Sequence, residues 1–269
     1  MSLNCSKKLY KKPGQLDLAM LSILSVEDMF DGFSGDDGWY RNYCVSNMKR
    51  IASDSLFVAS HLNSGDRLLD VGAVPPLMVA MLRRLGFSNL SISDPSENHF
   101  SSFCSKHNID YVQDDLLNNH FRDPIEQFDF VCLNEVIEHL AGNLIIAVES
   151  VAMCVRPGGH LLVTTPNLRS LSGLVALLLY SSGLASKPRE TVLAQYKRAS
   201  AKWGYFGHVR EYTTKETTDL VESFGFELVA IKMQPNYLDL GGLFRIVKAA
   251  ERFTPSWRLF GKYLFRKNN

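Results

Sequence analysis

Short apolar runs alternate with longer segments of helical spacing between residues 67 and 167. Each apolar run is bounded by Gly, Pro, Asp or Asn, which mark turns. This rhythm of strand and helix is typical of βαβ units, whose parallel sheet is buried on both faces. The predicted strands are 67–71, 89–93, 109–113, 128–133 and 160–165, and the predicted helices are 75–85, 95–107 and 139–155.

The alternation of strands and helices ends after residue 168. Before the first strand, an amphipathic helix is predicted over 40–62. Farther along the chain, Thr213 and Glu216 form a capping box at the start of a predicted helix. We expect an N-terminal helical segment over 1–62 and an α/β domain over 63–269, with a helical lid inserted at about 168–207. The further predicted elements are helices over 168–184, 187–202, 213–224 and 243–253, strands over 226–233 and 261–266, and an aromatic and glycine cluster over 203–207.

Composition narrows the class of protein. Hydrophobic residues make up 46% of the 269 residues, charged residues make up 21%, and the net charge is +1. These values indicate an ordinary globular protein with no overall field that would attract nucleic acid. Five cysteines without a C-x-x-C pair argue against a disulfide framework or a zinc site. With no signal peptide and no apolar run long enough to span a bilayer, we expect a soluble cytoplasmic protein.

Polar side chains gather at the ends of the predicted strands. In an open parallel sheet these ends share one edge, where ligands bind. Such a cluster of acids repels phosphate and suits a cationic ligand that carries an adenosine. Asp94 follows Gly72 by 22 residues, the usual spacing for an acid that holds the hydroxyls of a ribose. The candidate cofactor-binding residues are Asp70, Gly72, Ala73, Asp94, Asp114, Asp115, Asn134 and Glu135.

A nicotinamide enzyme is the alternative for this spacing. A dinucleotide-binding fold also carries a glycine turn followed by an acid, here Gly72 and Asp94. That fold expects G-x-G-x-x-G, and only the first glycine is present. The sequence therefore disfavours a dehydrogenase.

Several motifs in order resemble the class I S-adenosylmethionine-dependent methyltransferases, particularly the small-molecule O-methyltransferases of the ubiquinone-biosynthesis type. The motifs are Leu69-Asp70-Val71-Gly72, Asp94-Pro95-Ser96, Asp114-Asp115, Phe128-Asp129-Phe130-Val131, Glu135-Val136-Ile137-Glu138-His139-Leu140, Val155-Arg156-Pro157-Gly158-Gly159-His160-Leu161 and Gly207-His208-Val209-Arg210-Glu211-Tyr212-Thr213. The resemblance implies a doubly wound, Rossmann-like, mostly parallel sheet of seven strands with a reversed last strand. It also implies S-adenosylmethionine as the cofactor, with Asp70 and Gly72 near its methionine half, Asp94 on the ribose, Asp115 beside the adenine and Asn134 behind the sulfonium.

The expected reaction is methyl transfer to a small-molecule acceptor, with oxygen as the expected accepting atom. His139 and His208 are the candidate general bases, because histidine titrates near neutral pH. The structural alternatives are that His139 packs at the start of a helix, that Glu138 is a helix-start charge, and that Arg210 pairs with Glu211 at the surface. No metal site is expected.

Two further alternatives stay open. Val74 and Pro76 stand where the family usually carries glycines, which favours as an alternative an inactive methyltransferase-fold protein that acts as a partner or scaffold. Residues 241–269 hold seven Lys or Arg and one acid. We expect a solvated basic face there, and contact with a membrane surface is the less favoured alternative. The oligomeric state stays open.

Overall fold

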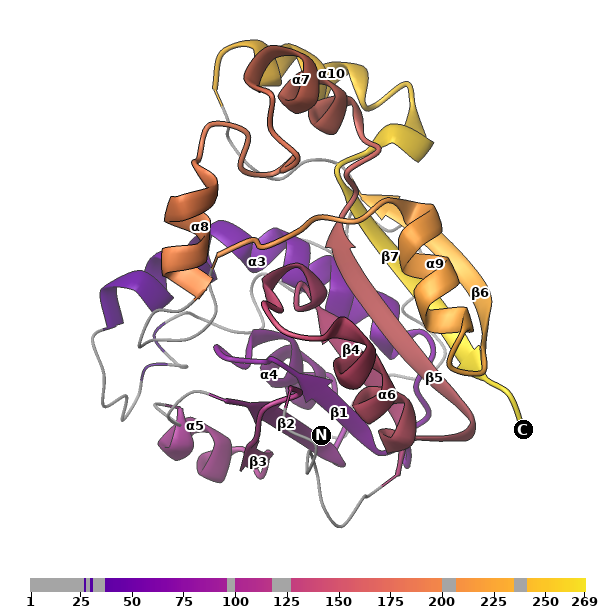
Figure 1. The fold of residues 1–269 in the computed structure, drawn as a ribbon. Coiled ribbons are helices and arrows are strands. Elements are labelled where there is room, and N and C mark those ends of the chain that lie inside the picture. The colour runs from indigo at the N-terminus through magenta and orange to yellow at the C-terminus, as the bar shows by residue number, and fades with distance from the viewer. Residues whose placement is uncertain are drawn as a thin grey trace. The chain divides into compact units, whose positions relative to one another are not determined.

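The computed structural model describes residues 27, 30, 37–95, 100–117, 127–199, 207–234 and 241–269. They belong to two compact units, residues 1–113 and 114–269. Seven strands form a mixed sheet in the order β3-β2-β1-β4-β5-β7-β6, so the predicted fold class is confirmed (Figure 1). The expected cluster over 203–207 lies outside the described residues except for Gly207.

The first unit carries three parallel strands. They are β1 (Leu68–Val71), β2 (Leu90–Asp94) and β3 (Asp110–Gln113), with Leu69 opposite Ser91 and Ser91 opposite Asp110 in the register. β1 is buried along its whole length, as its continuous apolar pattern predicts. The helices are α3 (Asp37–Ala59), α4 (Leu77–Arg84) and α5 (Ser101–Lys106).

Helix α3 packs on α4 through buried side chains, among them Ser55, whose Oγ lies 3.5 Å from Met81 Sδ. Tyr40 is buried, as a core position would be. Trp39, the residue before it, is not a core residue, since 44% of it is exposed. Its ring stacks on Tyr43 at the surface of the helix instead, with ring centroids 5.3 Å apart.

The second unit holds the remaining strands. β4 (Phe128–Asn134) pairs in parallel with β5 (Val155–Pro166), and β7 (Phe260–Lys267) runs antiparallel between β5 and β6 (Phe226–Gln234). The predicted reversal of the last strand is therefore confirmed. Its helices are α6 (Leu144–Cys154), α7 (Leu171–Tyr180), α8 (Val192–Ala199), α9 (Thr214–Glu222) and α10 (Leu243–Ala250), with the short 3-10 helices η1 (Ile137–His139) and η2 (Pro255–Trp257).

The predicted helix over 139–155 is wrong at its start. His139 ends the η1 turn, and α6 begins only at Leu144. The reason is Asn143, whose Oδ1 accepts a hydrogen bond from Ile145 N at 3.0 Å and caps the new helix. At α9 the predicted capping box between Thr213 and Glu216 is present in both directions.

The cysteines fit the expectation of no disulfide framework. Cys44, Cys104, Cys132 and Cys154 are buried free thiols. Burial raises the pKa of Cys44 to about 12 and that of Cys104 to about 11. Across the described part of the chain, no helix has the length and hydropathy that a membrane crossing requires.

Candidate active site

The candidate cofactor residues of the first unit lie at the ends of β1 and β2. Asp70 is buried within β1, and Asp94 ends β2 in a half-buried position. Gly72 turns the chain with a φ of 70°, in the left-handed region that favours glycine, and its N–H donates to Ser93 O at 2.7 Å. Ala73 follows and is buried.

Asp94 lies beside two tyrosines of the same unit. The Tyr111 hydroxyl donates to the backbone carbonyl of Asp94 at 3.5 Å. Burial, with the Asp94 charge as a second cause, raises the pKa of Tyr40 to about 12. The same two causes raise the pKa of Tyr111. A half-buried carboxylate beside aromatic rings suits a ribose and an adenine, so these residues fit the expected cofactor.

The candidate cofactor residues of the second unit also follow strand ends. Asp114 Oδ1 accepts from the N–H of Asp115, and Asp115 Oδ1 accepts from Leu117 N, both at 2.9 Å. Asn134 ends β4 opposite Thr164 of β5, in the register of the sheet. Each predicted residue therefore stands at the strand end that the sequence indicates, and its contact with the cofactor stays a prediction.

Glu135 turns the chain sharply after β4. Its φ is 55°, a left-handed conformation that is uncommon for a residue with a side chain. Two hydrogen bonds hold the turn, because its N–H donates to Thr164 O at 2.9 Å and to Thr164 Oγ1 at 3.1 Å. Thr164 thus fixes the direction in which the chain enters η1.

His139 is oriented by one backbone carbonyl. Its Nδ1 lies 3.0 Å from Gly207 O. A carbonyl oxygen only accepts, so Nδ1 must carry the proton of the bond, and in the neutral ring Nε2 keeps its lone pair. The side chain is 20% exposed.

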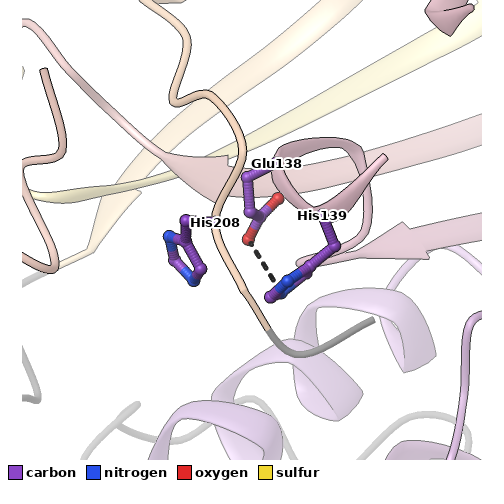
Figure 2. A group of neighbouring side chains, drawn as sticks. All are labelled: Glu138, His139 and His208. Atoms are coloured by element: carbon purple, nitrogen blue, oxygen red, sulfur yellow. Dashed lines mark ion pairs between the residues drawn. The ribbon is translucent and has the colours of Figure 1, made fainter. Parts of the chain in front are cut away.

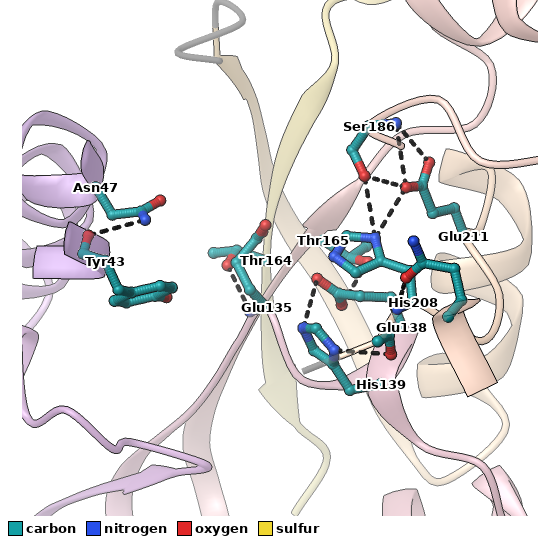
Figure 3. A network of polar contacts seen from close by, with 12 residues as sticks. Tyr43, Asn47, Glu135, Glu138, His139, Thr164, Thr165, Ser186, His208 and Glu211 are labelled. Carbon is teal, nitrogen blue, oxygen red and sulfur yellow. Dashed lines mark hydrogen bonds and ion pairs between the residues drawn. The ribbon is translucent and has the colours of Figure 1, made fainter. Parts of the chain in front are cut away.

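His208 is oriented by a carboxylate and a hydroxyl (Figure 3). Its Nδ1 lies 3.0 Å from both Glu211 Oε1 and Ser186 Oγ. Because the Ser186 hydroxyl donates its own proton to Glu211, Nδ1 of His208 must be the donor in this group. Nε2 is again the basic atom of the neutral ring.

The structure brings the two candidate bases together. The ring centroids of His139 and His208 are 4.7 Å apart, and the ring planes meet at 87°. The backbone supports this meeting, since the N–H of Val209 donates to Glu138 O at 2.7 Å. Residues 69 positions apart in the sequence therefore present two oriented imidazoles at one place (Figure 2).

Glu138 is a wholly buried carboxyl beside this pair. Thr165 Oγ1 donates to its Oε2 at 3.0 Å, whereas Oε1 has no hydrogen-bond partner among the described residues and lies 4.0 Å from His139 Nε2. Burial raises the pKa of Glu138 well above its usual range, and the negative charges of Glu135 and Glu211 add to the rise. Hydrogen bonds from the backbone and from Thr165 oppose it.

The same three side chains could hold a divalent cation. One ligand atom each from Glu138, His139 and His208 lies within 4.8 Å of the others (Figure 2). A histidine ligand in a metal site commonly donates its second nitrogen to a carbonyl or carboxylate, as both histidines do here. The expectation of no metal centre stays a prediction, and this group is the place to test it.

One structural alternative from the sequence is wrong. Glu138 does lie in the first turn of η1, and its carboxyl is buried and accepts from Thr165. Glu211 does not pair with Arg210 at the surface, because Glu211 is 1% exposed and Arg210 pairs with Glu216 instead. His208 and Glu211 are three positions apart, but the chain between them is not helical, so the helical spacing rule does not predict their contact.

Three residues around His208 were not predicted from the sequence to belong to the site. The N–H groups of Ala185 and Ser186 donate to Glu211, the former at 2.6 Å. Gln195 of α8 accepts from the N–H of His208 at 2.8 Å. The segment between β5 and α9 is thereby attached to the candidate base.

Comparison with known proteins agrees with this architecture. A family model described as a methyltransferase domain matches residues 41–231. The mitochondrial ubiquinone biosynthesis O-methyltransferase of Dictyostelium discoideum is 31% identical over 127 residues, which cover 42% of this chain and 39% of that protein. The Homo sapiens protein of the same name is 32% identical over 133 residues, which cover 45% and 34%. This chain therefore spans less than half the length of these curated relatives.

A solved structure shows the same fold. NodS, an N-methyltransferase from Bradyrhizobium japonicum WM9 in complex with S-adenosyl-L-homocysteine, has a TM-score of 0.53 at 14% identity, covering 90% of this chain and 98% of that one. The matched family model spans most of the chain, and the strand order agrees with it. The matched family model therefore places this chain in the class I S-adenosylmethionine-dependent methyltransferase family.

Proposed function

We propose that this chain transfers the methyl group to an oxygen atom of a small-molecule acceptor. The observation that carries the proposal is the pair of imidazoles whose Nδ1 atoms are both fixed by acceptors. A fixed Nδ1–H leaves Nε2 as the only atom that can take a proton, so both rings have the tautomer of a general base. The curated relatives, named O-methyltransferases, support oxygen as the accepting atom.

The cofactor, when bound, supplies a methyl group that the positive sulfur already activates. The residues that would hold it are those at the strand ends, with Asp94 on the ribose and Asp115 beside the adenine. The remaining task is to remove one proton from the acceptor hydroxyl, which His208 Nε2 or His139 Nε2 does. Glu138 Oε1 lies 4.0 Å from His139 Nε2, beside the imidazolium that results.

The segment from 168 to 207 would act as the lid that selects the acceptor and excludes water. Its attachment supports this role. Ala185 and Ser186 bind Glu211, and Gln195 binds the backbone of His208. The positions of Ala185, Ser186 and Gln195 are therefore coupled to the orientation of His208.

The experiment has two stages. Calorimetric titration with S-adenosylmethionine and with its demethylated product measures cofactor binding, and heat from neither would favour the scaffold that Val74 and Pro76 motivate. Methyl transfer is then measured on a panel of phenols, sugars, carboxylic acids and amines. Methylation of amines alone would refute oxygen as the acceptor.

The base is tested by substitution. His139→Ala and His208→Ala are expected to lower turnover at least tenfold while cofactor affinity stays nearly unchanged. His61→Ala, which changes a histidine of the first unit, is the matched control. Full turnover in both variants would show that neither histidine is the base. Treatment with a chelator distinguishes a general base from a metal site at Glu138, His139 and His208. If the chelator abolishes turnover and Mg²⁺ or Zn²⁺ restores it, these side chains bind a metal.

A further inference from the structure

Helices α7 and α10 lie side by side in the second unit (Figure 1). The rings of Tyr180 and Phe244 stack between them, with centroids 5.9 Å apart and planes at 26°. The hydroxyl of Ser172 donates to Glu251 Oε1 at 2.9 Å, and both side chains are buried. The inner side of the pair is thus a packed interface with polar groups that bond each other.

The outer side of α7 is apolar and exposed. Leu174, Leu177 and Leu178 are 43%, 58% and 69% exposed. Leu174 and Leu178 are four positions apart, so they share a face, away from the buried Gly173 and Ala176. The helix itself, from Leu171 to Tyr180, has no charged residue. Exposed leucines on adjacent turns are unusual for a helix that faces only water.

Helix α10, which packs on α7, also carries exposed apolar side chains and positive charge. Ile246 is 68% exposed and Phe253, just after the helix, is 87% exposed. Arg245, within the helix, and Arg252, two residues beyond its end, are both exposed.

The charge of this segment has one sign. Residues 241–258 contain four Lys or Arg and one acid, Glu251. That acid is 1% exposed, because it faces Ser172 in the packed interface. The one acid of the segment is therefore not part of its exposed side.

We propose that this surface, formed by Leu174, Leu177, Leu178, Ile246 and Phe253 with Arg245, Lys248 and Arg252, docks on an anionic lipid bilayer. Exposed leucines and a phenylalanine fit the boundary between headgroups and acyl chains, and adjacent arginines fit the headgroup phosphates. A second copy of the chain fits less well, since it would bring the same cations against each other. The docking is peripheral, and it does not depend on the acceptor proposed above.

Vesicle flotation of the full chain tests this docking. The vesicles contain either phosphatidylcholine alone or phosphatidylcholine with about 30% phosphatidylglycerol. The wild-type chain is expected to float with the anionic vesicles only, and less so in high salt. Flotation with neither vesicle, or equally with both, would overturn the proposal, and so would self-association through the same residues without lipid binding.

Matched variants locate the surface. The double variant Leu174→Gln with Leu178→Gln is expected to lower partitioning at least tenfold, and Val229→Gln with Ile231→Gln, two exposed apolar residues of β6, less than twofold. The double variant Arg245→Gln with Arg252→Gln removes two charges and is expected to lower partitioning onto anionic vesicles about 25-fold. Its control, Lys49→Gln with Lys197→Gln, removes two exposed charges elsewhere and is expected to lower partitioning less than threefold. Losses as large in the controls would overturn the assignment. Unchanged affinity for S-adenosylmethionine in every variant shows that the fold and the cofactor site are intact, independently of the docking result.

Discussion

Replacing Glu211 by glutamine tests whether the polar network under the candidate base stabilises the fold. The carboxylate accepts from Ala185 N at 2.6 Å, Ser186 N at 3.2 Å, the Ser186 hydroxyl and His208 Nδ1 at 3.0 Å. Glutamine keeps one oxygen and puts an NH₂ group where the other stood. Because an NH₂ group cannot accept, about two of the four donors lose their partner.

The magnitude follows from the kind of bond lost. A hydrogen bond to a buried charged group contributes about 1.5–3 kcal/mol, so two of them contribute about 3–6 kcal/mol. The Ser186 hydroxyl can rotate to accept from the new NH₂ group, which recovers about 1–2 kcal/mol. The expected loss in the free energy of unfolding is therefore about 2–4 kcal/mol, or a fall in Tm of roughly 5–15 °C.

Thermal unfolding at neutral pH measures this loss. Glu222→Gln is the matched control, since Glu222 is an exposed carboxylate at the end of α9 and its loss is expected to cost less than about 0.5 kcal/mol. If Glu211→Gln unfolds within about 2 °C of the wild type, the network does not stabilise the fold as the contacts indicate.

Turnover adds a test of how Glu211 acts. If Glu211 acts by holding the tautomer of His208, Glu211→Gln alone lowers turnover. The same substitution then causes little further loss of turnover in the His208→Ala background. Additive losses in the double variant would show that Glu211 affects turnover by another route.

Three other predictions concern the cofactor, pH and packing. Asp94→Ala should weaken S-adenosylmethionine binding more than about tenfold by calorimetry, and unchanged affinity would remove the ribose assignment. The raised pKa of Glu138 means that its contribution to stability is full below the usual carboxyl pKa and is lost as pH rises through the raised pKa. Glu138→Gln should therefore gain stability relative to the wild type as pH rises above the usual carboxyl pKa, and an equal difference in unfolding free energy at acidic and alkaline pH would contradict this. Gly173→Ala should destabilise by about 1–3 kcal/mol, because its Cβ would lie 1.9 Å from Leu168 O, whereas Gly183→Ala meets open space and is the control.

The sheet could be predicted from the sequence because its strands are buried runs with a clear pattern. β4 and β5 pair over their apolar residues, such as Val131 opposite Leu161, and such runs have few other stable arrangements. The break before α6 was missed although Asn143 is a good capping residue. The apolar residues after it continue the spacing of those before it, and periodicity alone does not show where a helix is interrupted.

The candidate site was predictable in its residues but not in its contacts. A local motif can nominate His139 and His208, yet their meeting depends on backbone bonds between distant segments, such as Val209 N to Glu138 O and His139 Nδ1 to Gly207 O. Each bond satisfies a polar group that would otherwise be buried without a partner, so the two segments hold each other in place. Displacing either segment would leave several buried donors unpaired at once. The orientation of both imidazoles is therefore a property of the folded second unit, and we expect hydrogen exchange at Val209 to be slow when compared with exposed positions of α8.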